Sequence, residues 1–296
     1  MNLPDIQAML HSFEQDVALL DEVHFTARAR AIDELEFYVL APLNLLPADS
    51  KPEEVYAVQQ AAESLTRQLE AVDTRLFERL RANIRAGEWK GTGFKQLIQK
   101  YVGEEASLTP VEIGYSALDL FIHKLLFLQP PPQATRIPEP EMVGYQPTPA
   151  HIIVELNEKA QFSPDDLFYD LGAGLGQVSL LIHLLSGVAV RGVEVEPAFC
   201  QHARACAAEL HLSEVSFLQT DARMADYSDG TMFFMYTPFT GKMLEEVLNK
   251  LRQVAQLRQI KIFTYGPCTP IIAKQTWLKC LENGVETDKL GSFISL

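Results

Sequence analysis

The sequence lacks both a long hydrophobic run and a cluster of positive charge. Its longest apolar stretch, VSLLIHLLSGVAV at 178–190, is too short and too interrupted to span a bilayer. The first ten residues contain Asp5 and no Lys or Arg, which is unlike an export signal. The 39 Asp and Glu residues outnumber the 25 Lys and Arg residues, and a net charge of -14 would repel a nucleic acid. We therefore expect a soluble cytoplasmic protein without membrane association, and we disfavour a nucleic-acid partner.

Cysteine and histidine are also sparse. The four cysteines, at positions 200, 206, 268 and 280, form no CxxC pair, and the first two have a helical spacing beside apolar neighbours. This pattern is typical of buried, reduced thiols. The seven histidines occur singly, without the HxH, HxxxH or mixed Cys/His spacing of a metal site. The sequence thus predicts a reducing compartment and no metal site.

The first part of the chain is rich in helical periodicity. Between Lys51 and Gly87 the apolar residues recur three and four positions apart: Ala62, Leu65, Leu69, Val72, Leu76 and Leu80. Such a stripe packs against another helix, and an internal core is favoured over a dimer interface, with the oligomeric state left open. The stretch TPVE at 109–112 has the pattern of a helix N-terminus. We predict an all-helical domain over residues 1–128.

Prolines mark the next segment. Seven of them fall within residues 129–149, which predicts an extended linker, placed at 129–147. From residue 148 to 296 short β-branched or aromatic runs alternate with helical stretches, and this alternation indicates an α/β domain with a parallel sheet covered on both faces. The tail at 283–296 suggests two short strands around Leu290-Gly291 with no room for a helix between them. We expect these to form an antiparallel pair at the sheet edge.

Three glycines follow the first of these runs. The stretch FYDLGAGLGQV at 168–178 places Gly172, Gly174 and Gly176 after a predicted strand and before a predicted helix. Glycine permits a positive φ, and a ligand can then lie against the free N–H groups of the helix. Glu194 ends the second predicted strand, where a carboxylate can accept both hydroxyls of a ribose. Together these residues predict a nucleoside-bearing cofactor, with tight strand–helix packing as the alternative.

Asp170 separates the possible cofactors. The turn has Gln177 where the dinucleotide motif GxGxxG has its last glycine, so the glycines alone leave the choice open. A carboxylate two residues before the first glycine would repel a pyrophosphate but would suit the ammonium of a methionyl group. The pattern D-x-G-x-G-x-G followed by GVE resembles the class I S-adenosylmethionine-dependent methyltransferases over residues 145–296. The resemblance implies a doubly wound, mostly parallel, seven-stranded Rossmann-like sheet with a reversed last strand.

The same resemblance implies the cofactor S-adenosylmethionine and roles for three acids. Asp170 and the glycine turn would hold the methionyl part, and Glu194 would bind the ribose. Asp221, in LQTDAR after the third predicted strand, would lie at the adenine. A helix or turn cap is the other interpretation of Asp221.

A closer resemblance is to the non-SET histone-lysine methyltransferases of the disruptor-of-telomeric-silencing family. DLGAGLGQV is similar to their glycine turn, Gln177 included, and YQPT at 145–148 can be aligned with their Tyr-x-x-Thr cofactor loop. This alignment implies that Tyr145 and Thr148 contact the cofactor. Thr148 also suits the N-cap of a helix that begins at Pro149.

The sequence departs from that family after the fourth predicted strand. The family has an Asn-Asn-Phe-Ala-Phe loop there, and this chain has Met-Tyr-Thr-Pro-Phe at 235–239, without the family's long basic tail. The loop would still bring Tyr236, Thr237 and Phe239 to a methyl acceptor, which must be positioned, shielded from water and deprotonated. It is neither the Asn-Pro-Pro-Tyr of amino-directed nucleic-acid enzymes nor a set of Mg²⁺ carboxylates. A loop that only closes the strand is the alternative.

These patterns predict a methyltransferase that uses S-adenosylmethionine and acts on an unidentified acceptor. We rank a protein side chain such as lysine first, a small molecule second and a nucleic acid third. Two other classes stay open. One is a nicotinamide-dependent oxidoreductase on the same scaffold, and the other is a non-catalytic cofactor-binding protein whose functional surface is the stripe at 62–80.

Overall fold

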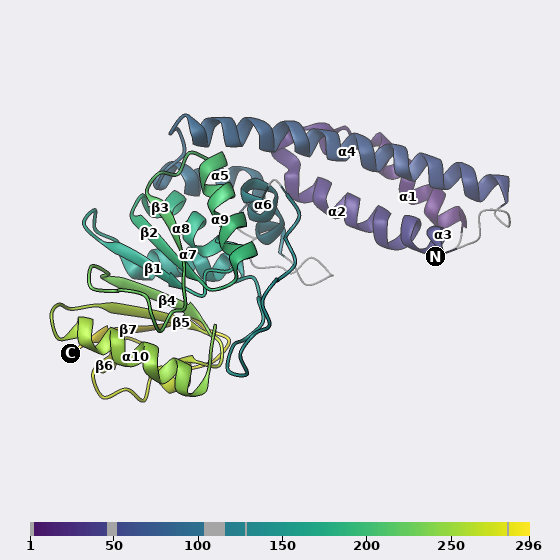
Figure 1. The fold of residues 1–296 in the computed structure, drawn as a ribbon. Coiled ribbons are helices and arrows are strands. Elements are labelled where there is room, and N and C mark those ends of the chain that lie inside the picture. Colours follow the sequence, from purple (N-terminus) through teal and green to yellow (C-terminus); the bar gives the residue numbers. More distant parts are fainter. Residues whose placement is uncertain (1–2, 46–51, 104–115, 128, 283) are drawn as a thin grey trace. The chain divides into compact units, whose positions relative to one another are not determined.

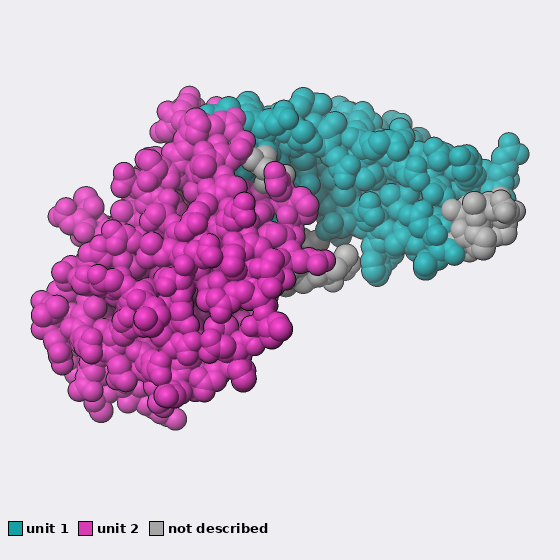
Figure 2. Space-filling view, in the orientation of Figure 1, with its two compact units in different colours: residues 1–82, 96–125 teal, residues 83–95, 126–296 magenta. Residues whose placement is uncertain are grey.

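The computed structural model describes residues 3–45, 52–103, 116–127, 129–282 and 284–296. The chain forms two compact units, one of residues 1–82 and 96–125 and the other of residues 83–95 and 126–296 (Figure 2). Residues 129–147, which the sequence marks as a linker, are part of the second unit. None of the described helices is long and apolar enough to cross a membrane.

The first unit is helical. Its elements are α1 (Leu3–Gln15), η1 (Val17–Leu20), η2 (Glu22–His24), α2 (Phe25–Leu35), the π-helical turn η3 (Glu36–Leu40), α3 (Ala41–Asn44), α4 (Glu53–Arg85), α5 (Thr92–Val102) and α6 (Ala117–Leu126). Every residue of the predicted stripe on α4 is buried, and Ala62, Leu65 and Leu69 share one hydrophobic cluster with residues of α1, α2 and α3. The stripe is therefore core, and the idea that it forms an exposed interaction surface is wrong.

A buried ion network lies within this unit. The Arg28 Nε donates to Asp73 Oδ1 at 2.6 Å, and the Lys124 Nζ donates to Asp73 Oδ2 at 3.1 Å. Arg28 also donates to the backbone carbonyls of Leu19 and Asp21. Arg28 is fully buried, and these partners occupy the donors that burial would otherwise leave without water.

The predicted start of a helix at 109–112 lies outside the described residues. The described helix α6 begins after Ser116, whose hydroxyl accepts from the Asp119 N–H at 3.1 Å. The Asp119 carboxylate in turn accepts from the Ser116 N–H at 3.1 Å. This reciprocal pair is a capping box with Asp in place of Glu, a signal in SALD that our sequence analysis missed.

The second unit contains the predicted sheet (Figure 1). Its strands are β1 (Leu167–Leu171), β2 (Ala189–Glu194), β3 (Val215–Gln219), β4 (Met232–Tyr236), β5 (Lys261–Tyr265), β6 (Leu278–Cys280) and β7 (Gly291–Ser295), in the order β3-β2-β1-β4-β5-β7-β6. The first five pair in parallel, and β7 runs antiparallel to β5 and β6. This arrangement confirms the doubly wound, mostly parallel, seven-stranded sheet.

Helices cover both faces of this sheet. They are α7 (Ala150–Ala160), α8 (Gln177–Ser186), α9 (Pro197–Glu209), α10 (Gly241–Ala255) and the short α11 (Thr269–Ile272). Figure 1 shows α8 and α9 on one side of the sheet and α10 on the other. The central strands are apolar on both faces because both are covered, and Phe233 and Phe234 on β4 are each at most 1% exposed.

The edge of the sheet differs in detail from our expectation. The antiparallel pair exists, but only β7 lies in the tail at 283–296, and its partner β6 lies upstream at Leu278–Cys280. The residues between them include no strand among those described. The strand β6 was missed because its three residues, LKC, are too few to show a period of two.

Candidate active site

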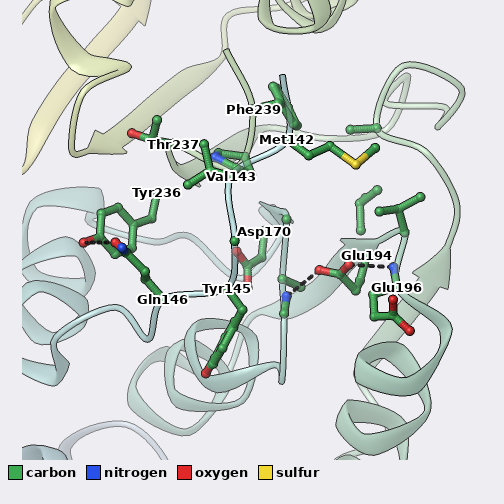
Figure 3. A pocket seen from close by; sticks show the side chains of 18 of the residues that line it. Met142, Val143, Tyr145, Gln146, Asp170, Glu194, Glu196, Tyr236, Thr237 and Phe239 are labelled. Atoms are coloured by element: carbon green, nitrogen blue, oxygen red, sulfur yellow. Dashed lines mark hydrogen bonds between the residues drawn. The ribbon is translucent and has the colours of Figure 1, made fainter. Parts of the chain in front are cut away.

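The carboxyl ends of the parallel strands open into one cavity of about 610 Å³. Strand β1 lies between β2 and β4, so successive connections leave it in opposite directions, and ligands of open α/β sheets bind at such a point. In Figure 3, Asp170 lies near the middle of the view, with Glu194 and Glu196 on one side and Tyr236 and Gln146 on the other. Every residue proposed from the sequence lines this cavity except Gly176.

Asp170 is the second-last residue of β1 and is 2% exposed. The hydroxyl of Ser179, on α8, donates to its Oδ2 at 2.8 Å. Burial raises the pKa of Asp170 to about 7, with a further contribution from the charge of Glu194, while the Ser179 hydrogen bond opposes the rise. Burial therefore disfavours the ionised carboxylate, and a bound cation would stabilise it.

Glu194 ends β2 and is held by the backbone. Its Oε2 accepts from the Gly174 N–H and its Oε1 accepts from the Glu196 N–H, each at 2.7 Å. Burial raises the pKa of Glu194 despite these hydrogen bonds. A carboxylate has about four lone-pair directions, so each oxygen keeps one for a ligand hydroxyl.

The three glycines of the turn all have positive φ, at 81° for Gly172, 53° for Gly174 and 86° for Gly176. A Cβ at Gly172 would collide with the Pro238 ring, and one at Gly174 would lie 2.5 Å from the ring of Tyr145. These two glycines line the cavity with their backbone closely covered by the chain's own side chains. A larger residue fits neither position.

Gly176 has a different role. A Cβ there would lie 2.7 Å from the Phe217 ring and 2.9 Å from the Ala203 Cβ. Those contacts join the start of α8 to β3 and α9, which is the strand–helix packing that was the alternative interpretation of the turn. That alternative accounts for Gly176, while Gly172 and Gly174 lie at the cavity.

Asp221 follows β3 and lines the cavity, but Arg223 occupies its carboxylate. Its Oδ1 accepts from the Arg223 backbone N–H at 2.8 Å and from Arg223 Nε at 3.0 Å. The side-chain hydrogen bond from Arg223 is the main cause of the lowered pKa of Asp221. Asp221 thus closes a turn, and any contact with an adenine would be additional to that role.

Tyr145, Thr148 and Gln177 lie together at the cavity wall. The Gln177 side-chain amide donates to the Thr148 carbonyl at 3.0 Å, which ties α8 to the segment before α7. Helix α7 begins at Ala150 with Pro149 as N-cap and no side-chain cap. The expectation that Thr148 caps this helix is therefore wrong, because the helix begins one residue later than predicted and Pro149 occupies the N-cap position.

The loop after β4 lines the cavity on the side away from Glu194 and Glu196. Thr237 has a φ of 40°, and its hydroxyl donates to the Tyr265 carbonyl at 3.1 Å and accepts from the Cys268 N–H at 3.0 Å. Phe239 is 5% exposed and belongs to the hydrophobic core. Both residues border the cavity, but their main contacts are structural, as the alternative interpretation of this loop expects.

Tyr236 presents its phenol to the cavity. Its hydroxyl donates to Gln146 Oε1 at 3.3 Å, and its ring lies 4.8 Å from the ring of Tyr265 at an angle of 53°. Gln146 and Tyr265 both line the cavity, and neither was singled out from the sequence. Gln146 lies within the YQPT motif, and Tyr265 lies at the end of a predicted strand. These two positions in the sequence could have indicated that both residues line the cavity.

The proline-rich segment at 134–146, which we call the strap, covers the cavity. The Glu196 carboxylate accepts from the Thr135 hydroxyl at 2.6 Å and from the Arg136 N–H at 2.8 Å. Burial works to raise the pKa of Glu196, but these bonds and one from the Ala198 N–H outweigh it and lower the pKa to about 2. One end of the strap is thereby fixed to the start of α9.

The other end of the strap is fixed to α10. The Glu141 carboxylate accepts from the Lys242 N–H at 3.1 Å and the Met243 N–H at 2.8 Å. The Val143 N–H donates to the Pro238 carbonyl at 3.1 Å, and Met142 forms an isolated bridge with Phe239. Between the two ends, Glu139 accepts from Arg223 at 3.0 Å.

Comparison with known proteins identifies this region. Residues 143–233 match the family model described as "Histone methylation protein DOT1". Over these residues the chain is similar to that family. The chain is a methyltransferase, and S-adenosylmethionine is its cofactor. The matched segment includes the end of the strap, the glycine turn and Glu194.

Two solved structures of methyltransferases are similar to part of this chain. One is an RNA methyltransferase from Salinibacter ruber in complex with S-adenosyl-L-homocysteine, at 21% identity over 51% of this chain and 92% of that chain, with a TM-score of 0.39. Another is precorrin-6y C5,15-methyltransferase from Geobacter metallireducens, at 17% identity over 52% and 90%, also with a TM-score of 0.39. No curated protein matches the sequence.

The described residues contain no group of three His, Cys, Asp or Glu side chains that could hold a metal ion. The described cysteines are all free, and three of the four are buried.

Proposed function

We propose that the protein transfers a methyl group from S-adenosylmethionine to a protein side chain, with the lysine amine as the first candidate. The match of residues 143–233 to a family model for histone methylation carries this proposal. An acidic lining supports it, because five acids face the cavity and Arg136 is the one cation among the described lining residues. The acids are Asp170, Glu194, Glu196, Asp221 and Asp288. An amine acceptor suits such a field better than a phosphate does.

The residues present fit the cofactor. The buried carboxyl of Asp170 would receive the methionyl ammonium, and the free lone pairs of Glu194 would receive the ribose hydroxyls. When bound, S-adenosylmethionine supplies an electrophilic methyl group on a sulfonium. Tyr145, Thr148, Gly172, Gly174, Gln177 and Asp221 would complete the contacts, and Gly176 would act through packing.

The remaining residues act on the acceptor. The strap would exclude water from the cavity, since its residues line the opening between α9 and α10. The Tyr236 hydroxyl and the Gln146 amide oxygen are polar groups that could orient an acceptor N–H. Thr237 and Phe239 would shape the wall. An amine must lose a proton before it can attack, and the open end of the cavity gives that proton a path to water.

A small-molecule acceptor is the second candidate, and a nucleic acid the third because of the net charge of -14. A nicotinamide oxidoreductase fits poorly, because the buried Asp170 would face a pyrophosphate. A non-catalytic protein would bind the cofactor and transfer nothing. We place the reaction in the cytoplasm, where the free cysteines of the described chain would stay reduced.

The acceptor class can be tested by labelling. The purified protein is incubated with S-adenosylmethionine carrying a radiolabelled methyl group and a lysate of its own source, and label is followed in the macromolecular fraction. We expect label that protease removes and nuclease does not, and methyl-lysine in the acid hydrolysate. The Asp170→Asn variant should give no label. Nuclease-sensitive label would instead favour a nucleic acid, and label confined to small molecules would reject the protein acceptor.

A further inference from the structure

The end of the cavity beyond Asp170 includes two tyrosines and one acid. Tyr236 and Tyr265 are half-buried, with their rings 4.8 Å apart, and Asp288 is exposed nearby. The Gly266 N–H donates to the Thr287 carbonyl at 2.9 Å, which holds the loop of Asp288 against the end of β5. Burial is the main cause of the raised pKa of Tyr265, and the charges of Tyr236 and Asp288 contribute to it.

Asp288 differs from the other acids of the lining because it lies at this end. Asp170, Glu194, Glu196 and Asp221 come from β1, from the end of β2 and from the turn after β3. Each of them accepts hydrogen bonds from Ser179, backbone N–H groups, the strap or Arg223. Among the described residues that line the cavity after β4 and β5, Asp288 is the one charged side chain.

The described lining residues therefore provide an anion and two tyrosine rings where an acceptor would enter, and no cation, since the neighbouring Lys289 pairs with Glu286 outside the lining. A carboxylate attracts an ammonium group, and the face of a tyrosine ring attracts one as well. A phosphate or carboxylate acceptor would meet only repulsion from Asp288.

We propose that Asp288, with the ring faces of Tyr236 and Tyr265, selects an acceptor that enters as a primary ammonium group. The inference rests on the proposed function and names the residues that give it its specificity. The ammonium could belong to a lysine side chain or to a small amine, and protease-sensitive label in the experiment above distinguishes these sources.

Analogues of S-adenosylhomocysteine that extend into the acceptor end of the cavity can test this preference for an ammonium group. The probes are three analogues of S-adenosylhomocysteine in which a nitrogen replaces the sulfur and bears a four-carbon chain. The chain ends in an amine, an alcohol or a carboxylate. Calorimetry on the full chain should give the amine an affinity about tenfold higher than the alcohol, from one partly exposed ion pair and one cation–π contact. The carboxylate should bind more weakly than the alcohol.

Two variants and a control locate the effect. Asp288→Asn should reduce the advantage of the amine about threefold, and Tyr265→Leu should reduce it further, with Tyr265→Phe close to wild type. Glu245→Gln removes the same charge from an exposed position on α10 that lies outside the cavity lining, so it should change nothing. All variants should bind S-adenosylhomocysteine and the alcohol as wild type does, which shows that they are folded.

The outcomes separate the two proposals. Binding of S-adenosylhomocysteine with equal affinity for the amine and the alcohol would overturn this inference and leave the proposed function intact. An amine preference that Asp288→Asn and Tyr265→Leu leave unchanged would also overturn it. If S-adenosylhomocysteine itself failed to bind, the proposed function would fail and this inference with it.

Discussion

At the scale of single residues, Asp170 governs the site. Its carboxyl is buried beside Ser179 and within the field of Glu194, and its pKa is raised to about 7. Near neutral pH, folding therefore has to place a partly charged group in a low-dielectric environment with a single side-chain donor. The methionyl ammonium would relieve this cost, so part of the stability of the protein is given up to bind a cation.

This cost predicts how stability depends on pH. The folded pKa of Asp170 lies above that of an unfolded aspartate, so the free energy of unfolding should fall as pH rises from about 4 toward 7. Asp170→Asn cannot ionise and should be more stable than wild type at about pH 8, by on the order of 2 kcal/mol. Urea denaturation without ligand at about pH 5 and pH 8 measures this. A variant that is less stable at the higher pH would contradict it.

Ser179 should lower the pKa of the Asp170 carboxyl group. Ser179→Ala removes the hydrogen bond that favours the ionised carboxylate, so the pKa of Asp170 should rise further. We expect the pH at which S-adenosylhomocysteine affinity is half-maximal to increase by about half a unit to one unit. The matched control is Ser186→Ala, because Ser186 lies on the same helix and donates to the Ile182 carbonyl instead. Identical pH profiles for the two variants would contradict a role for Ser179 in positioning Asp170.

At the scale of elements, the strap is fixed by acids that no local pattern reveals. Glu141 caps α10 from a hundred residues upstream, and Glu196 binds the strap from the start of α9. The prolines at 129–149 correctly indicated an extended segment, because proline excludes regular helix. They could not indicate its partners, since the contacts form only when β2 and β4 are adjacent to β1 in the sheet.

The anchor at Glu196 can be tested by proteolysis. Glu196→Gln weakens the bonds to the Thr135 hydroxyl and the Arg136 N–H, which should free this part of the strap. Trypsin should then cut after Arg136 about fivefold faster, because cleavage follows local opening. Glu209→Gln, at the other end of α9, provides the control. Mass spectrometry identifies the fragment that begins at Ile137, and equal rates in both variants would show that Glu196 does not hold the strap.

At the scale of the whole molecule, much of the fold was predictable from the sequence. The alternating apolar runs predicted the parallel sheet, because strands buried on both faces have a distinctive composition. Asp170 and Glu194 could be placed at the cavity because each lies at the carboxyl end of a strand, and these strand ends border the cavity.

Residues brought in by long-range contacts were not predictable. Tyr265 reaches the cavity from the end of β5, and Asp288 reaches it from the loop between β6 and β7. Their local sequences carry no catalytic motif, and only the assembled sheet brings them to one place.

The central claim is that the cavity binds S-adenosylmethionine, with Asp170 at the methionyl ammonium and Glu194 at the ribose hydroxyls. Calorimetric titration with S-adenosylhomocysteine tests it most directly. Wild type should bind saturably, and Asp170→Asn and Glu194→Gln should each weaken binding about tenfold or more, since each removes charge-assisted hydrogen bonds of about 1.5–3 kcal/mol. The exposed Glu286→Gln should bind like wild type. Unchanged affinity in both site variants, or saturable binding of NADH in place of S-adenosylhomocysteine, would contradict the account.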